Sequence, residues 1–324
     1  MQKITQNIFV VTSPMQLFAV DIILNEMNDC GHVKNFVFIF YKSEQSFKIK
    51  NAIVFNYDTN TYIKKVYSIF RFKKDIDKIL SSENTNILYI AHPFHFACNY
   101  LAFNNFAEKI YLLPDGILNY YEARIDNNSL KKMIQGKILC AMAGINYKMF
   151  KGHYTGYELG IYSGVYCFSE KRLLTKTGKI FNIAKTSVNI GLKPLKDICL
   201  FIDQPVNKSI HYDLAKRIND FFLSRQFKKI IYKKHPSYKC DSLKYLLNSG
   251  AEICLIESKM PIEMLFDEID AGYIVSFDSS ALLTLKFLYP DRECVSIGMD
   301  LFCQQDYQLY KIKKIFMEQG IVLL

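Results

Sequence analysis

The 324-residue sequence lacks the short signatures that identify many protein classes. None of its nine cysteines forms a Cys-x-x-Cys pair, so neither a zinc site nor a disulfide framework is indicated. Gly-x-Gly-x-x-Gly and Walker sequences are also absent, which argues against dehydrogenases and P-loop enzymes. The cysteines are scattered, mostly through apolar stretches, so we expect reduced, buried thiols in a cytosolic protein.

Metal-binding patterns are missing as well. His, Asp and Glu residues do not cluster at the spacing of metal ligands. Asp75 and Asp77 stand in a lysine-rich helical stretch, which does not resemble a metal–diphosphate motif. We therefore expect no metal site and no cofactor.

No apolar run approaches the roughly 18–20 residues of a membrane span. The apolar stretch 8–24 has the length of a signal peptide, but Thr12, Pro14 and Asp21 interrupt it. We therefore expect a cytoplasmic protein, with peripheral contact at the inner face of the cell membrane as a further expectation.

The chain has fewer acidic than basic residues, 31 against 41, for a net charge of +10. Such a charge suits nucleic acid, anionic lipid headgroups or an acidic substrate, and lysine-rich composition alone explains it equally well. The basic residues are spread over the whole chain and form no basic arm. A nucleic-acid-binding module is therefore the weakest of these interpretations, because it requires a clustered basic face.

Half of the residues are hydrophobic, which is enough for a sizeable core, and their order is informative. Apolar strands alternate with amphipathic helices from residue 8 to 116, and the alternation restarts at residue 198 after a less regular middle and an expected linker, 185–196. This order predicts an α/β protein with parallel sheets. We expect two Rossmann-like domains facing across a cleft, with boundaries 1–190 and 191–324.

Three short motifs follow predicted strands, where α/β folds place ligand-binding groups. In the first, Asp115 and Gly116 come after the apolar strand 109–113. A carboxylate at a strand end can take a proton from a hydroxyl. Pro-Asp-Gly is also a common turn sequence, so on its own the motif fits a turn aspartate better. We favour the base because two further motifs accompany it.

The second motif is Lys234-His235-Pro236, at the end of strand 229–232. The proline fixes the turn, and an imidazole held there can donate to a phosphate oxygen. A solvent-facing loop histidine is the alternative. His92 shares the His-Pro context, and we interpret it chiefly as a residue at the entry of a helix, with a role in the site as the alternative.

The third motif, Ser279-Ser280, opens the predicted helix 280–288. Helix N-terminal N–H groups and two hydroxyls can bind an anion, although simple N-capping would look the same in sequence. Glu263 opens a short helix two residues after Pro261. It fits a ribose-binding carboxylate and a charge favoured by the helix dipole equally well.

In this order the motifs resemble the bacterial sialyltransferases of GT-B fold, glycosyltransferase families 38, 52 and 80 and streptococcal capsule relatives. Those enzymes share an acidic-acidic-Gly, a His-Pro and a Ser-Ser motif. Here Pro114 replaces the first acid, and the second, their base, is kept as Asp115. The segments 12–16 and 201–205 also look like the opening of family 52 members and the start of their nucleotide-binding domain, which makes Gln16 and Gln204 additional candidates.

The resemblance implies an inverting, metal-independent transfer of sialic acid from CMP-sialic acid to a glycan hydroxyl of O-antigen, capsule or lipooligosaccharide. Residues 1–190 would bind the acceptor and residues 191–324 the nucleotide-sugar. The implied roles are Asp115 and His235 for catalysis and, for CMP, Gly116, Pro236, Glu263, Ser279 and Ser280, with Lys234 as an additional candidate. A related transferase using CDP-glycerol, CDP-ribitol or another CMP-nonulosonate is the alternative.

Overall fold

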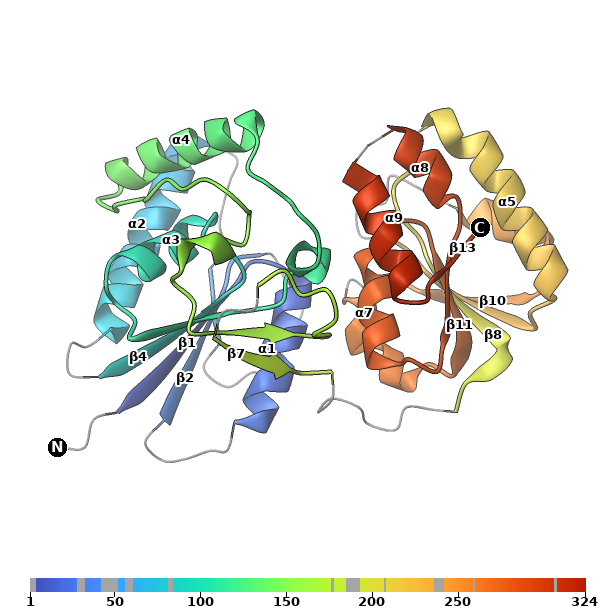
Figure 1. Ribbon diagram of the computed structural model, residues 1–324, viewed down its shortest axis with the longest axis horizontal. Helices are drawn as coiled ribbons and strands as arrows, with labels where there is room; N and C mark the ends of the chain where they lie inside the picture. The colour runs from blue at the N-terminus through green and yellow to red at the C-terminus, as the bar shows by residue number, and fades with distance from the viewer. Residues whose placement is uncertain are drawn as a thin grey trace. The chain divides into compact units, whose positions relative to one another are not determined.

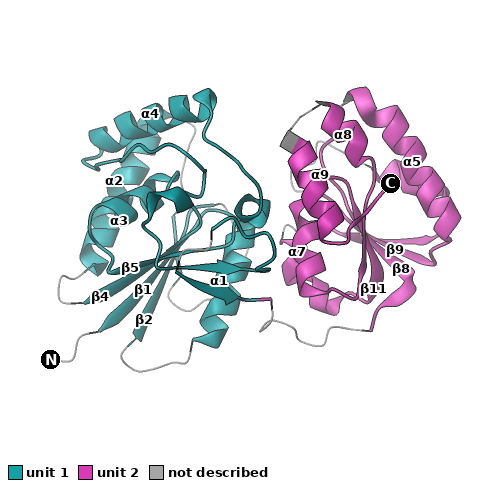
Figure 2. Ribbon diagram, in the orientation of Figure 1, with its two compact units in different colours: residues 1–183 teal, residues 184–324 magenta. Residues whose placement is uncertain are grey.

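The computed structural model divides the chain into two compact units, residues 1–183 and 184–324 (Figures 1 and 2). The structure describes residues 4–27, 33–41, 52–55, 61–80, 84–175, 178–184, 193–206, 208–235, 242–258, 260–305 and 308–324. The domain boundary that the sequence suggested, 190/191, lies outside these ranges. Each unit is an α/β body built on its own parallel sheet.

Unit 1 contains a seven-stranded sheet in the order β3-β2-β1-β4-β5-β6-β7, and every ladder between these strands is parallel. Its strands are β1 (Thr5–Val11), β2 (Val33–Ile39), β3 (Ala52–Val54), β4 (Thr85–Ile90), β5 (Lys109–Leu112), β6 (Gly164–Cys167) and β7 (Lys179–Asn182). β1 and β4 begin with polar residues and end in apolar runs, 8–11 and 87–90, as expected where both sheet faces are covered.

The helices of unit 1 are α1 (Pro14–Glu26), α2 (Tyr62–Ile79), α3 (Phe96–Phe103) and α4 (Asn127–Met142). Helix α1 begins as the sequence predicts: the Ser13 hydroxyl accepts from the Gln16 N–H, and Pro14 occupies the first turn, where its missing N–H costs nothing. Two short 3₁₀ turns, Gly116–Asn119 and Tyr157–Leu159, lie on the connection from β5 to β6.

Unit 2 repeats the architecture with six strands in the order β10-β9-β8-β11-β12-β13, again all parallel. They are β8 (Leu195–Ile202), β9 (Lys229–Lys233), β10 (Glu252–Ile256), β11 (Ala271–Ser276), β12 (Glu293–Ser296) and β13 (Val322–Leu323). The helices are α5 (His211–Arg225), α6 (Leu243–Leu246), α7 (Ser280–Leu288), α8 (Met299–Gln305) and α9 (Gln308–Glu318), accompanied by the 3₁₀ turns Lys208–Ile210, Leu247–Ser249, Ile262–Met264 and Phe266–Glu268.

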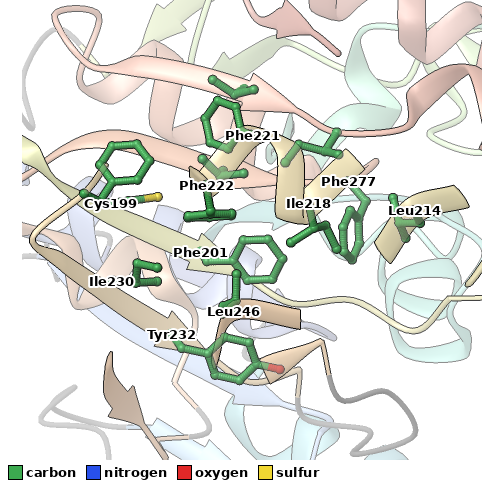
Figure 3. Packing of buried hydrophobic residues seen from close by; sticks show 14 of the residues in the cluster. Cys199, Phe201, Leu214, Ile218, Phe221, Phe222, Ile230, Tyr232, Leu246 and Phe277 are labelled. Atoms are coloured by element: carbon green, nitrogen blue, oxygen red, sulfur yellow. The ribbon is translucent and has the colours of Figure 1, made fainter. Parts of the chain in front are cut away.

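Aromatic side chains dominate the core of unit 2 (Figure 3). Phe201 of β8 stacks on Tyr232 of β9, with ring centroids 5.8 Å apart, and meets Phe222 of α5 and Phe277 edge-on. These four side chains are at most 1% exposed. Burial of this kind contributes roughly 1.5–3 kcal/mol for each large apolar side chain. The strand ends that carry the polar motifs therefore project from a rigid base.

Each sheet has one point where the strand order reverses. In unit 1 the chain moves outward from β1 through β2 to β3 and returns to pair β4 on the other side of β1. In unit 2 the same reversal places β9 and β11 on either side of β8. Open α/β sheets bind ligands at the carboxyl ends of the strands beside such a reversal. The two reversals therefore indicate where a site belongs in each unit.

The prediction was wrong about the strands of the middle region, although the helix that we expected near 130–142 is present as α4. The stretch expected to be irregular holds β6 and β7, and β8 begins at Leu195, inside the segment expected as linker. The strands β3 and β13 and helix α8 were also missed. β6 is only four residues long, and a Cβ on Gly164 would lie 2.7 Å from the Lys179 carbonyl oxygen of β7. Short strands and a glycine required by close approach weaken the sequence pattern.

Two further observations bear on the expectations from sequence. The seven cysteines within the described residues are free thiols, six buried and Cys254 partly exposed. Across the same part of the chain, no helix has both the length and the apolar character needed to cross a membrane.

Candidate active site

The carboxylate of Asp115 lies at the carboxyl end of β5, in unit 1. Its backbone N–H donates to the Asn119 side-chain oxygen at 2.9 Å, which closes the turn after the strand. Gly116 follows with φ +54°, a left-handed conformation that favours glycine, and opens the 3₁₀ turn. This Asp-Gly pair therefore lets the chain reverse while the carboxylate stays at the sheet edge.

Gln16, in the first turn of α1, holds one oxygen of that carboxylate. Its Nε2 donates to Asp115 Oδ1 at 2.9 Å, and its Oε1 accepts from the Thr12 N–H at 2.7 Å and from the Thr12 hydroxyl at 3.0 Å. A backbone N–H can only donate, so Oε1 must face Thr12 and the amide nitrogen must face Asp115. Gln16 is 1% exposed, and its orientation is fixed.

His92, two residues beyond β4, lies beside the same carboxylate. Its Nε2 is 3.8 Å from Asp115 Oδ2, and the two side chains are 18% and 16% exposed. Its Nδ1 is buried and has no hydrogen-bond partner within the described chain. Helix α3 begins only at Phe96, with His95 as its N-cap, so His92 is not the entry residue of that helix, and the alternative, a role in the site, stays a prediction.

The N-cap of α3, His95, is a neutral neighbour of this group. Burial, with a smaller contribution from His92, lowers the pKa of His95 to about 3. Its ring packs 4.8 Å from Phe40 and 4.5 Å from Phe96, centroid to centroid. The His95 imidazole is therefore uncharged at neutral pH. His92, and not His95, is the histidine beside the Asp115 carboxylate.

The unit 1 residues thus converge from the ends of β1, β4 and β5, around the reversal in strand order. One oxygen of Asp115 is bound to Gln16, while the other is directed toward His92. Asp115 and His92 remain accessible enough to meet a ligand. Chemically, this arrangement can orient a hydroxyl and take its proton.

In unit 2, Asp203 lies at the carboxyl end of β8, beside the reversal in strand order, and is fully buried. It accepts hydrogen bonds from the Tyr232 hydroxyl, from the Ser242 hydroxyl at 2.7 Å and N–H at 3.2 Å, and from the Gln204 N–H at 2.9 Å. These bonds join the ends of β8 and β9 to the start of α6. Asp203 was missed, although it follows an apolar strand just as Asp115 does.

His235 follows β9 and is partly exposed. Burial lowers its pKa, and Lys233 lowers it further, while Asp203 opposes both. Lys233 itself is 4% exposed, and its ammonium donates to the Ser258 carbonyl oxygen. Lys234 is partly exposed as well, whereas Pro236 lies outside the described residues. A neutral imidazole and a buried ammonium therefore stand together at this strand end.

Glu263 lies in the 3₁₀ turn Ile262–Met264 and is 7% exposed. Burial raises its pKa to about 7, against the opposing effects of its own backbone N–H and of Lys233. Burial has the opposite effect on the pKa of Lys233, which it lowers, and the nearby Glu263 carboxyl counteracts that lowering. The two groups are thus electrostatically coupled, a relationship that their distance in the sequence did not reveal.

Ser279 caps α7 at the carboxyl end of β11. Its hydroxyl accepts from the Ala281 N–H at 3.3 Å and is largely buried, at 7% residue exposure, whereas Ser280 is exposed. The N-terminus of this nine-residue helix therefore opens beside the reversal in strand order. Near it in the topology, at the end of β8, Gln204 Oε1 is buried without a hydrogen-bond partner in the described structure.

Several predicted site residues are thus brought together within their own units. Gln16 joins Asp115 in unit 1, and in unit 2 His235 and Glu263 interact electrostatically with the same ammonium, that of Lys233. Ser279 takes the capping role that its sequence also allowed. No group of three or more His, Cys, Asp or Glu side chains in the described ranges is arranged to hold a metal ion.

Two Rossmann-like units, each with polar groups at its reversal in strand order, define the GT-B class of fold, as the sequence predicted. A model of the family described as alpha-2,8-polysialyltransferase (POLYST) matches residues 7–297. The chain belongs to this family, and the resemblance to bacterial sialyltransferases is confirmed.

Solved structures agree on the fold. A sialyltransferase from Photobacterium damsela is similar with a TM-score of 0.53 and 14% identity over 99% of this chain and 81% of that one. S. aureus MnaA, in a co-structure with UDP, gives 0.54 and 13% over 97% and 88%. The UDP-GlcNAc 2-epimerase from Methanocaldococcus jannaschii gives 0.50 and 14% over 96% and 92%. No curated protein sequence matches the chain.

Proposed function

We propose that this protein is an inverting, metal-independent sialyltransferase that moves sialic acid from CMP-sialic acid to a hydroxyl of a cell-surface glycan. The observation that carries the proposal is the Asp115 carboxylate, oriented by Gln16 at the reversal in the unit 1 sheet. Membership of the alpha-2,8-polysialyltransferase family supports sialic acid as the transferred group.

Asp115 acts as the general base. Its carboxylate takes the proton of the acceptor hydroxyl as that oxygen forms a bond to the anomeric carbon of sialic acid. The bond from this carbon to the CMP phosphate oxygen breaks on the opposite face, its electron pair leaves with CMP, and the configuration inverts. Gln16 keeps Asp115 Oδ1 occupied at 2.9 Å, which leaves the other oxygen for the hydroxyl. General base catalysis of this kind contributes roughly 10²–10⁴-fold.

Unit 2 stabilises the departing phosphate. His235, which takes up a proton from solvent when the donor phosphate binds beside it, donates an N–H to a phosphate oxygen and stabilises the negative charge that develops there. The N-terminus of α7, with the Ser279 and Ser280 hydroxyls, binds the other phosphate oxygens. The exposed Ser280 is available for this contact, and Ser279 anchors the helix that presents it.

The nucleoside is held by Glu263 and Gln204. Glu263 accepts from the ribose hydroxyls, and the unpartnered Oε1 of Gln204 gains a donor from the ligand. Gly116, Lys234 and Pro236 complete the set implied by the sequence. On the acceptor side we propose O-antigen, capsule or lipooligosaccharide, the glycans that the resemblance to bacterial sialyltransferases implies.

The first experiment is a calorimetric titration of the purified protein with CMP, CDP and UMP, in the absence of added metal. We expect CMP to bind and UMP to bind more weakly. Preference for CDP would point instead to a transferase for a CDP-linked polyol such as CDP-glycerol. If no cytidine nucleotide binds, the proposal fails.

The second experiment measures transfer from CMP-sialic acid to sialylated and galactose-terminated acceptors by Asp115→Asn and the wild type. The variant is expected to lose roughly 10²–10⁴-fold in turnover, with unchanged CMP affinity. The matched control is Asp126→Asn, the same change at the exposed N-cap of α4, where asparagine caps a helix as well as aspartate does. Near-normal turnover by Asp115→Asn, with activity lost in His92→Asn, would contradict the assignment of Asp115 as the base and favour His92 in that role.

A further inference from the structure

The outer face of α2 exposes large apolar side chains. Ile63, Tyr67 and Phe70 are 83%, 66% and 53% exposed, and their spacing of four and three residues places them on one side of the helix. The opposite side is the one that packs into unit 1, through the buried residues Ile69, Phe72 and Ile76. Packing of α2 into unit 1 therefore does not explain why this exposed side of the helix is apolar.

Helix α4 repeats the pattern. Ile134, Ile138 and Met142 are 49%, 56% and 68% exposed and lie four residues apart, while Met133 and Cys140 are buried on the other side. The two helices contact each other within unit 1 (Figure 1). Two contacting helices that each expose an apolar stripe are unusual on a protein surface that only water covers. We call these six side chains and their two helices the α2/α4 face.

The charge of the α2/α4 face has one dominant sign. Helix α2 carries six Lys or Arg and two Asp, and α4 carries three Lys and no acidic residue. Their net charge of +7 is most of the +10 of the whole chain. Both acids of α2 are already engaged, Asp75 with Arg71 and Asp77 with Lys73.

We propose that the α2/α4 face docks on the surface of a lipid bilayer that contains anionic headgroups. Basic helices with an exposed apolar stripe lie in the plane of such a surface, with the apolar side chains at headgroup depth and the cations over the phosphates. A protein partner fits less well, because lysine is depleted from protein–protein interfaces and eight of these nine cations are lysines. The inference goes beyond the proposed reaction and does not depend on the sugar donor.

The test is co-sedimentation of the full chain with vesicles of phosphatidylcholine alone or with about one third phosphatidylglycerol, at ~0.1 M and ~0.5 M salt, where the Debye length falls from about 10 Å to about 4–5 Å. We expect binding to the anionic vesicles at low salt, and at least about tenfold weaker partitioning at high salt or without phosphatidylglycerol, as expected when several basic residues contribute. Equal binding to both vesicle types, or none to either, overturns the proposal.

Variants locate the surface. Ile63→Ser/Tyr67→Ser/Phe70→Ser and Ile134→Ser/Ile138→Ser should each lower partitioning at least about fivefold, because apolar area no longer enters the interface. The matched control is Tyr212→Ser/Leu223→Ser on α5, which also removes exposed apolar side chains, 83% and 56% exposed, and should bind as the wild type does. Unchanged vesicle binding by both the α2 and the α4 variant overturns the proposal. So does a wild-type protein that is a dimer in analytical ultracentrifugation while these variants are monomers, because the face would then be a protein–protein interface.

CMP titration separates this inference from the proposed reaction. All three variants should bind CMP with wild-type affinity, which also shows that they are folded. Loss of vesicle binding with normal CMP binding supports the α2/α4 face alone. If the wild-type protein binds anionic vesicles but no cytidine nucleotide, the membrane-docking proposal stands and the sialyltransferase proposal fails.

Discussion

Gln16 and Asp115 are 99 positions apart in sequence, and a 2.9 Å hydrogen bond joins the Gln16 amide nitrogen to the Asp115 carboxylate. Gln16 stands at the start of the first helix and Asp115 after the fifth strand of the same unit. In the sheet, β4 lies between β1, which precedes Gln16, and β5, which precedes Asp115. The hydrogen bond therefore reaches across the end of β4 and orients the carboxylate that we propose as the base. Replacement of Gln16 should therefore alter the titration of the base before it alters the fold.

Gln16→Glu should move the acidic limb of the pH profile of kcat/KM to higher pH. The new carboxylate lies within hydrogen-bond distance of Asp115, and two like charges at that separation raise the pKa of the pair. The base is then protonated over a wider range, so activity at low pH falls more than activity at high pH. The measurement is kcat/KM between about pH 5 and 9 for both proteins.

Gln16→Leu is the companion variant. It removes the hydrogen bond to a charged group, typically worth about 1.5–3 kcal/mol, and leaves the Thr12 N–H without its partner. We expect lower stability in urea unfolding and a kcat lower by about tenfold or more. An unshifted pH profile for Gln16→Glu, together with normal kcat for Gln16→Leu, would show that Gln16 does not act on the base.

Ser279→Asp should separate helix capping from phosphate binding. Aspartate is as good an N-cap as serine and suits the positive end of the helix dipole, so α7 should stay stable. Its negative charge, however, repels the CMP phosphate, and we expect CMP affinity to fall about tenfold or more, that is by at least ~1.4 kcal/mol. Calorimetry measures the affinity and thermal unfolding the stability.

Two alanine variants complete that comparison. Ser279→Ala should lose about 1 kcal/mol of stability because it removes the cap. Ser280→Ala, at an exposed position outside the capping bond, should weaken CMP binding without loss of stability. If Ser279→Asp binds CMP as the wild type does, the phosphate does not lie at this helix N-terminus.

CMP binding should draw a proton onto His235. Burial lowers the pKa of His235, so the free protein holds the imidazole neutral near neutral pH. A phosphate beside it favours the charged form and raises the pKa, so CMP binding takes up protons at pH values between the pKa of the free protein and that of the complex. Calorimetry in buffers of different ionisation enthalpy counts these protons.

His235→Asn should abolish that proton uptake and weaken CMP binding. His211→Asn is the matched control, since His211 of α5 is in the same unit and contacts the Val206 carbonyl oxygen. Proton uptake that persists in His235→Asn would assign it to another group and remove His235 from the phosphate site.

Glu263 should make the unfolding free energy depend on pH. Its folded pKa of about 7 exceeds the unfolded value of 4.5, so the folded chain holds the proton more tightly. The stability contributed by the protonated form is fully present below pH 4.5 and is lost as the pH rises through about 7. The loss amounts to about 3 kcal/mol, because each pKa unit is worth about 1.4 kcal/mol.

Glu263→Gln removes the titration, and the difference in unfolding free energy between wild type and variant should therefore change by about that amount between about pH 5 and 8. Urea unfolding of both proteins measures it, with the exposed Glu268→Gln as control. Parallel stability curves for wild type and Glu263→Gln would show that Glu263 is not the group that titrates.

The sequence by itself predicted both sheets and the strand ends that carry Asp115, His235 and Ser279. Strand and helix periodicity, together with caps such as Ser13 and Ser279, depends on neighbouring residues, so it is visible in one dimension. The motif order was enough to suggest the sialyltransferases, and the family match confirmed it.

Tertiary structure decided which of these groups act together. The contact of Asp115 with Gln16 and His92, the burial of Asp203 and the coupling of Lys233 to Glu263 join positions that are distant in the chain. Such contacts depend on strand order, which parallel crossovers set and local patterns do not encode. The short strands β6 and β7 became strands for the same reason, because only pairing with neighbours from elsewhere in the sequence satisfies their backbone groups.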